Sequence, residues 1–166
     1  MSIDLILPLS LASGVVLWAL IFRWYVDPIA QRVSLVDVLQ PILLLHSFRF
    51  IGLMFLIDGV TSAPLDPRFA EPAAYGDLIS AILAFAALLA VRGMGDRALW
   101  MVWVFNLWGL GDLLNAVARG LQFTPDGALG AAFWIPAAIV PLLLVTHGYV
   151  FVLLRRAHLH RRMATA

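Results

Sequence analysis

Long apolar runs constrain the fold of this chain more than any other feature of its sequence. A helix needs roughly 20 apolar residues to cross the hydrocarbon core of a bilayer, which is about 30 Å thick. Five runs approach that length, at about residues 5–22, 36–57, 73–91, 98–118 and 131–154. Charged residues make up only 13% of the chain, against roughly 25% in a soluble domain. We therefore predict an all-α fold, an integral membrane bundle of five transmembrane helices.

The positions of the arginines predict how the bundle is oriented. Membrane proteins keep an excess of Lys and Arg in the short loops on the cytoplasmic side. With the C-terminus placed inside, eight arginines lie on the cytoplasmic side, two lie outside and one lies within a span. We expect the N-terminus outside, the C-terminus in the cytoplasm, and a multi-pass location in the plasma membrane of a bacterium (its inner membrane). Residues 1–166 then form a single transmembrane domain, in which residues 155–166 are a basic cytoplasmic tail.

Two missing residue types exclude several classes of function. All eleven basic residues are arginine, so no lysine is present for a Schiff base or a phosphate-binding P-loop. The absence of cysteine excludes thiol catalysis, disulfides and cysteine-ligated metal centres. A net charge of +1 without a soluble basic patch gives no support for nucleic-acid binding. The expected partners are the lipid bilayer and a small-molecule ligand, with a second copy of the chain or another membrane subunit as open alternatives.

Ionisable side chains within the predicted spans mark the candidate site, because each costs a few kcal/mol at membrane depth and needs a partner. His46 and Arg49 lie three residues apart in the second run, so they share one helix face. Arg49 stays protonated and therefore needs a carboxylate, a carbonyl oxygen or a bound anion. Two interpretations stay open: an ion pair that fixes two helices, and a clamp for the carboxylate of a ligand or cofactor.

The fourth run supplies the expected partner of Arg49. Trp108, Asp112 and Asn115 recur at helical spacing and form one stripe. If this span runs from inside to outside, Asp112 lies in the outer half of the membrane, as Arg49 does, and the two can meet. Asn106 falls on another face of the helix, so we expect it to bond a second helix.

The third run adds Tyr75 and Asp77 near its outer end. Because Asp77 lies about one turn from the predicted membrane interface, we expect its carboxylate to be solvated. The alternative is a second carboxylate beside Arg49 and Asp112, where two acids would titrate as a coupled group and carry protons. The preceding connection, residues 58–72, contains three prolines and is expected to lie over the mouth of the bundle as a stiff lid.

A second histidine, His147, lies in the fifth run without any charged neighbour in that span. At 1.5 Å of rise per residue, the heights of His46 and His147 differ by roughly 6 Å, which helix tilt can close. Bis-histidine ligation of a b-type haem iron requires two imidazoles on different helices at comparable depth. The sequence therefore suggests His46 and His147 as the ligands of the haem iron, with Arg49 receiving a propionate.

Three hypotheses of function follow. The first is a buried polar site that binds a small molecule or cofactor, in its most concrete form haem b, with Tyr75, Asp77, Trp108, Asp112 and Asn115 as further ligand or ion-pair residues. The second is a non-catalytic structural or assembly subunit in which the same polar residues only fix helix packing. The third is a small proton-coupled carrier. No complete catalytic constellation is present, so whether the protein is an enzyme stays open.

Overall fold

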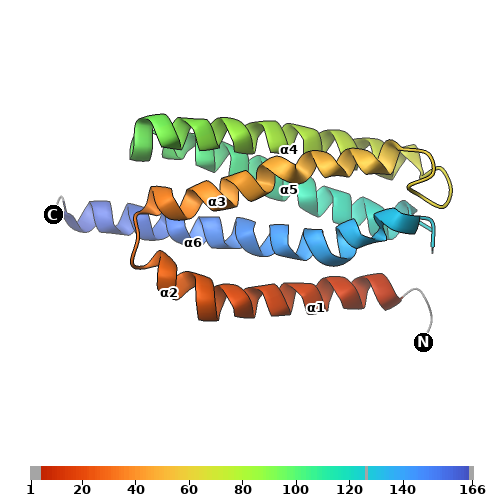
Figure 1. Cartoon of the computed structure of the whole chain (residues 1–166), viewed down its shortest axis with the longest axis horizontal. Coiled ribbons are helices and arrows are strands. Elements are labelled where there is room, and N and C mark those ends of the chain that lie inside the picture. Colours follow the sequence, from red (N-terminus) through yellow and green to blue (C-terminus); the bar gives the residue numbers. More distant parts are fainter. Residues whose placement is uncertain (1–4, 126, 165–166) are drawn as a thin grey trace.

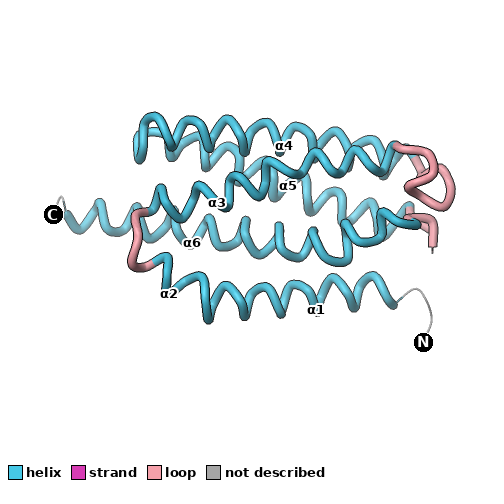
Figure 2. The backbone as a smooth tube through the Cα atoms, viewed as in Figure 1, coloured by secondary structure: helices cyan, strands magenta, loops and turns pink. Residues whose placement is uncertain are grey.

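The computed structural model describes residues 5–125 and 127–164, which form an elongated bundle of helices (Figure 1). The α-helices are α1 (Ile6–Ile21), α2 (Asp27–Ala30), α3 (Leu35–Ser47), α4 (Pro67–Met94), α5 (Leu99–Phe123) and α6 (Val140–Ala164). Short 3-10 and π-helical turns extend or join them: η2 (Phe22–Val26), η3 (Phe48–Leu56), η4 (Gly95–Ala98), η5 (Gly130–Phe133) and η6 (Ile135–Ile139). The long helices lie along one common axis, and the connections gather at the two ends of the bundle (Figure 2). The predicted all-α fold is confirmed.

Among the described residues, four continuous helical segments are long and apolar enough to cross a membrane. They are Ile6–Ala30, Leu35–Leu56, Pro67–Phe123 and Gly130–Leu159. This number differs from the five predicted spans, because the runs at 73–91 and 98–118 belong to one uninterrupted helical segment of 57 residues. Within it, α4 and α5 fold back on each other at η4 (Figure 1). Gly95 permits this turn, since it has a φ of 57°, which costs glycine little.

The proline-rich connection before α4 is shorter than the sequence predicts. The helix begins at Pro67, and the side chain of Asp66 caps it by accepting a hydrogen bond from the backbone N–H of Arg68 (2.8 Å). Proline suits this position because the first turn of a helix needs no N–H from it. The remaining connection is bound to the segment before α6, since Ser62 donates its backbone N–H to the carbonyl of Ala128 (3.0 Å).

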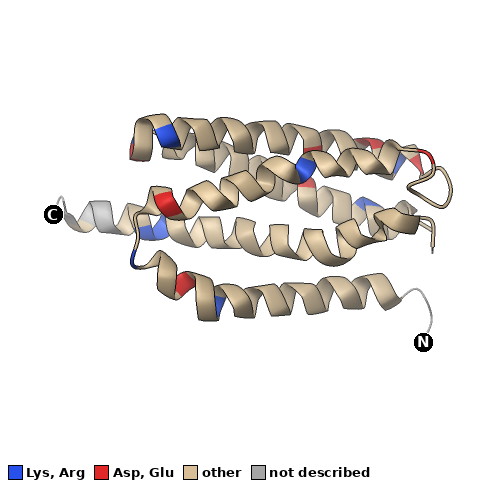
Figure 3. Ribbon diagram, in the orientation of Figure 1, with Lys and Arg blue, Asp and Glu red and all other residues tan. Residues whose placement is uncertain are grey.

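The C-terminal end also differs from its prediction. Helix α6 continues through residues 155–164, so the described part of the expected basic tail is helical, while residues 165–166 lie outside the described range. This end of α6 extends beyond the other helices in Figure 1. The charged residues gather mainly toward the two ends of the bundle, and one small group of opposite charges lies within its length (Figure 3).

The core of the bundle is formed by α3, α4, α5 and α6. Its largest fully buried apolar side chains include Leu39, Leu43, Val102, Phe105 and Val150. Helix α4 contributes a series of buried alanines, among them Ala73, Ala84 and Ala87. Small residues let neighbouring helices approach closely. Such close packing is a main source of helix association in a lipid bilayer, where the contact expels no water.

Helix α1 lies outside this core and packs mainly against α6 and η6 (Figure 1). No residue of α1 is buried. The close approach to α6 depends on Gly14, where an added Cβ would come within 2.7 Å of the Cγ atom of Pro141. Beyond α1, Asp27 accepts hydrogen bonds from the Tyr149 hydroxyl (2.9 Å) and from Nη1 of Arg156 (2.5 Å). Polar contacts therefore attach the N-terminal helix to the bundle at its α2 end.

Candidate functional site

Arg49 is the centre of the candidate site. It lies at the start of η3, where the last turn of α3 tightens into a 3-10 helix, and its side chain is 1% exposed. The Nε group donates to Oδ1 of Asp77 (2.7 Å), and Nη2 donates to Oδ2 of Asp112 (2.8 Å). Nη2 also lies 2.7 Å from Oδ1 of Asp77, and Nη1 donates to the carbonyl of Gly109 (2.9 Å). The buried charge is thus paired with two carboxylates, as a guanidinium at this depth requires.

These contacts decide two predictions made from the sequence. The expected contact between Arg49 and Asp112 is confirmed. The expected solvation of Asp77 is wrong: its side chain is 12% exposed and joins the same arginine, which is the alternative arrangement with two carboxylates. The site therefore connects η3, α4 and α5 through a single guanidinium.

His147 on α6 completes the first ring of contacts around Arg49. Its Nε2 atom lies 3.2 Å from Nη1 of Arg49, and its Nδ1 atom lies 2.8 Å from Oδ1 of Asn106. Because a guanidinium can only donate, Nε2 must accept, so the proton is on Nδ1 and points to Asn106. Nδ2 of Asn106 also donates to the backbone carbonyl of His147 (3.2 Å), which confirms that Asn106 bonds a second helix.

His46 lies beside His147 but belongs to a separate hydrogen bond. Its Nε2 atom is 2.8 Å from the hydroxyl of Thr146. That hydroxyl has a single proton, which it donates to a backbone carbonyl of the preceding turn, at Leu142 or Leu143 (2.9 Å each). The His46 Nε2 atom must therefore donate, which leaves Nδ1 as an acceptor. Among the described residues, the buried Nδ1 atom of His46 has no hydrogen-bond partner.

Three glycines surround the charged cluster; the sequence predicts close helix packing at Gly76 and Gly109 and gives no role to Gly52. A Cβ at Gly52 would come within 2.2 Å of Asp77 Oδ2, one at Gly76 within 1.7 Å of Asp112 Oδ1, and one at Gly109 within 2.7 Å of His147 Cε1. None of the three lies at a turn or a cap. A glycine in the interior of a helix, where no turn or cap requires one, indicates a packing or functional role, and this signal could have identified all three.

The two histidines meet, but their arrangement does not fit haem ligation. The centroids of the His46 and His147 rings lie 4.3 Å apart, closer than most paired aromatic rings, and both side chains are fully buried. A porphyrin between them has no room, and Nε2 of His147 is already occupied by Arg49. The described residues also contain no group of three or more His, Asp or Glu side chains suited to a metal ion.

The remaining predicted residues line a groove on the surface between α4 and α5. Tyr75, Trp108, Asp112 and Asn115 all border it. Asn115 does not reach Arg49; its Oδ1 atom accepts a hydrogen bond from Nε of Arg119 (2.9 Å). Of the charged cluster residues that the structure describes, only Asp112 borders the groove.

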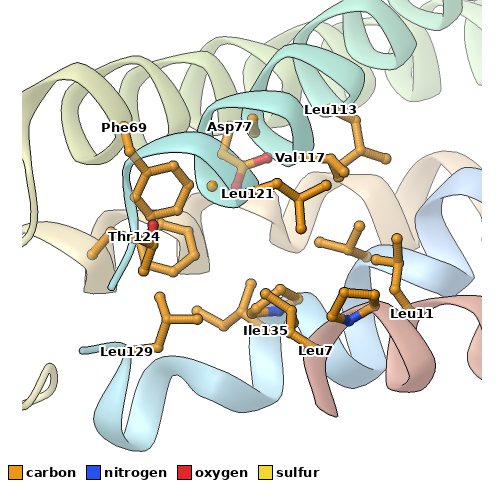
Figure 4. A pocket seen from close by; sticks show the side chains of 16 residues that line it. Leu7, Leu11, Phe69, Asp77, Leu113, Val117, Leu121, Thr124, Leu129 and Ile135 are labelled. Atoms are coloured by element: carbon orange, nitrogen blue, oxygen red, sulfur yellow. The ribbon is translucent and has the colours of Figure 1, made fainter. Parts of the chain in front are cut away.

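A second cavity lies between α1, α5 and the start of the α6 segment (Figure 4). It has a volume of about 140 Å³ and is lined by apolar side chains such as Leu7, Phe69, Leu113 and Ile135. Of the residues that the structure describes, Asp77 is the only charged one in its wall. We call this cavity the Asp77 pocket.

The carboxylate of Asp77 uses only one of its oxygens for Arg49. Its Oδ2 atom accepts no hydrogen bond from the described residues. Thr124, which follows α5 and also lines the Asp77 pocket, has a buried Oγ1 atom without a hydrogen-bond partner in the described part of the chain. Thr124 Oγ1 thus has unused hydrogen-bonding capacity, which is uncommon for a buried group. Asp77 Oδ2 is a further acceptor in the same wall.

Comparison with known proteins places the chain in a family. No curated protein and no solved structure matches it. A family match extends over residues 6–155, which include the residues that form the cluster, the groove and the pocket. The chain therefore belongs to the family described as "Domain of unknown function (DUF8737)".

Proposed function

We propose that this protein is a multi-pass membrane protein that binds a small, largely apolar molecule in the Asp77 pocket. The observation that carries the proposal is an apolar cavity with a single charged residue in its wall, held in place by a buried guanidinium. Ligand sites in proteins are typically apolar cavities with a few well-placed polar groups. The volume of about 140 Å³ resembles the engineered apolar cavities of about 150 Å³ that bind benzene.

The unpaired polar atoms define the chemistry of the ligand. Asp77 Oδ2 offers a hydrogen-bond acceptor, and the hydroxyl of Thr124 offers either a donor or an acceptor. The ligand that suits both is an amphipathic molecule with an apolar body and a hydroxyl group that donates to Asp77. In this proposal Arg49 is a positioning residue, because it fixes the orientation of the Asp77 carboxylate without lining the pocket.

Photolabelling with a matched pair of probes tests this proposal. The first probe is 4-(1-azi-2,2,2-trifluoroethyl)benzyl alcohol, and the second is its parent aryl diazirine, which lacks the hydroxymethyl group. We expect saturable labelling of pocket residues, with Asp77→Asn weakening the alcohol probe more than its parent. Val117→Trp fills the pocket and should abolish labelling, whereas Leu114→Trp, on the exposed face of the same helix, should leave it unchanged. Equal labelling of all lipid-facing residues, unaffected by Val117→Trp, would contradict the proposal.

The proposed membrane topology has five crossings, with α4 and α5 each crossing once. Helix α4, with 28 residues, is about 42 Å long, and α5, with 25 residues, is about 37 Å long, so each exceeds the roughly 30 Å core. The excess of arginine at one end supports an outside N-terminus and a cytoplasmic C-terminus in a bacterial plasma membrane. Single cysteines at Ser62 and Met94 test this, since only the first should react with an impermeant maleimide in intact cells.

A structural role is the second candidate, and the complete pairing of Arg49 favours it. Each nitrogen of the guanidinium has an acceptor, and these acceptors lie on three other helices. If the cluster only fixes helix packing, Asp112→Asn should lower the unfolding temperature and leave probe labelling unchanged. If Asp112→Asn leaves stability unchanged, the structural role is excluded.

A proton-coupled carrier is the third candidate. One guanidinium faces two carboxylates, so binding of a single proton would make the cluster neutral. Asp77 and Asp112 also border different cavities. Proton flux in proteoliposomes, measured with an internal pH-sensitive dye, should then disappear in Arg49→Gln. Absence of flux in the wild-type protein would exclude this candidate.

A further inference from the structure

The groove between α4 and α5 is a second candidate site, distinct from the Asp77 pocket. It is bordered by the aromatic rings of Tyr75 and Trp108, by Arg68 and Glu71, and by the carboxylate of Asp112. We call it the α4–α5 groove. Tyr75 is 54% exposed and Trp108 is 47% exposed, so both rings are free to contact a ligand. One ring comes from each helix, and both border the same groove.

Asp112 brings an incompletely paired carboxylate to this groove. Its Oδ2 atom accepts from Arg49 (2.8 Å) and from the hydroxyl of Ser80 (3.5 Å). Its Oδ1 atom lies against Gly76 and accepts no hydrogen bond from the described residues. The side chain is 8% exposed and borders the groove. A carboxylate oxygen that borders a groove without a donor from the described residues can accept a hydrogen bond from a ligand or face its positive charge.

The charges around the groove also favour a cation. The cluster and the groove contain the carboxylates of Glu71, Asp77 and Asp112 and the guanidinium groups of Arg49 and Arg68. Asp66 and Arg119 lie beside them, since each contacts Arg68. Asp66 is ionised at neutral pH, because hydrogen bonds from Arg68 lower the pKa of its carboxyl group to about 2. Four carboxylates against three guanidinium groups leave one negative charge uncompensated. The imidazole of His147 contributes no charge here, since it accepts a hydrogen bond from Arg49.

We propose that the α4–α5 groove binds an organic ammonium group. Aromatic faces attract such cations through the negative charge of their π-systems, and quaternary ammonium groups are the preferred ligands of aromatic cages. Asp112 supplies the opposite charge behind the rings. A metal ion is disfavoured because the described residues provide no group of three or more His, Asp or Glu ligands. The ammonium group comes either from a zwitterionic lipid headgroup or from a free organic cation.

A comparison of choline with 3,3-dimethylbutan-1-ol tests this proposal, because the two molecules have the same shape and differ in charge. Binding is measured by titration calorimetry on the purified full-length protein in detergent. We expect choline to bind at least about tenfold more tightly than the neutral alcohol, and Trp108→Leu to weaken choline severalfold. Trp100→Leu, an exposed tryptophan of the same helix away from the groove, should change nothing. Equal binding of both molecules, or no effect of Trp108→Leu, would overturn the proposal.

Three further measurements complete the experiment. Asp112→Asn should weaken choline binding by about tenfold or more. If this variant does not fold, choline binding by the Tyr75→Leu and Trp108→Leu variants tests the proposal instead. In nanodiscs of phosphatidylcholine, choline should bind more weakly than in nanodiscs of phosphatidylglycerol if the lipid headgroup is the natural occupant. Equal affinity in both identifies a free cation. Val117→Trp blocks the Asp77 pocket but should leave choline binding intact. The proposals for the pocket and for the groove are therefore tested independently.

Discussion

Nη1 of Arg49 lies 3.2 Å from Nε2 of His147, and this contact fixes the state of the histidine. Only a neutral imidazole with its proton on Nδ1 can accept from a guanidinium at Nε2. That proton is in turn accepted by Asn106. The charge of Arg49 thus orders a chain of polar groups from η3 through α6 to α5, and several consequences of this order can be measured.

Removal of the guanidinium alone should strongly destabilise the bundle. Arg49→Met leaves Asp77 and Asp112 buried beside each other without a counter-charge, and the expected loss is about 3–5 kcal/mol of unfolding free energy. The triple variant with Asp77→Asn and Asp112→Asn in addition should recover part of this loss, because no buried charge remains. Denaturation in mixed detergent micelles measures both, with Arg92→Met at an exposed position as the control. A triple variant less stable than Arg49→Met would contradict the importance of the charges.

A pair of glycine variants tests whether the charged cluster needs the space that Gly76 leaves free. Gly76→Ala would place a Cβ within 1.7 Å of Asp112 Oδ1, so the carboxylate must move away from Arg49. We expect a loss of at least about 2 kcal/mol. Gly111→Ala on α5 has no heavy atom within 4 Å of the new Cβ and should be neutral or stabilising by up to about 1 kcal/mol. Equal unfolding temperatures for the two variants would show that Asp112 can be moved without cost.

The two histidines should differ in their importance for stability. His147→Leu removes one of the two acceptors of Arg49 Nη1 and the donor to Oδ1 of Asn106, and it should cost about 2–3 kcal/mol. His46→Leu removes a ring whose Nδ1 is already unpaired, and Thr146 keeps its bond to a backbone carbonyl. The expected change is within about 1 kcal/mol. Thermal unfolding of the two purified variants measures the difference, and an equal loss for both would contradict it.

The contact of Asp27 with α6 should control how firmly the first helix is held. Asp27→Ala removes the acceptor for Tyr149 and Arg156, while α1 itself buries no residue. Spin labels at Leu9 and Leu121, both exposed, report the separation of α1 and α5 by double electron–electron resonance. We expect the distance distribution to become about twice as broad, because more orientations of α1 are populated. Arg32→Ala, at an exposed position, is the control, and an unchanged width would refute the role of Asp27.

Much of the cluster could be predicted from depth and periodicity alone. Arg49 and Asp112 were placed in the same half of the membrane, and Asn106 was assigned to a different helix face, because helical geometry fixes both relations. Asp77 was misplaced for one reason: the helix was expected to begin near residue 73, whereas α4 begins at Pro67. Ten residues of helix separate Pro67 from Asp77, so the carboxylate lies about 15 Å inside the helix start rather than one turn.

Other features depend on contacts between helices, which a single sequence does not contain. The roles of Gly52, Gly76 and Gly109 follow from side chains that arrive from other helices. The direct contact of His46 with His147 depends on irregular turns: η3 follows α3, and the π-helical turn η6 precedes α6. Such turns shift the register of a helix relative to its neighbours, so heights counted along an ideal helix are displaced.

The attachment of the first helix at its α2 end has a mechanical consequence. About 20 residues separate Asp27 from Leu7 at the far end, where the helix contributes to the wall of the Asp77 pocket. At 1.5 Å of rise per residue, Leu7 lies about 30 Å along the helix from Asp27. If the helix tilted by about 5° around Asp27, Leu7 would move by about 2.6 Å. Access to the pocket from the lipid can therefore change while the four helices around Arg49 keep their register.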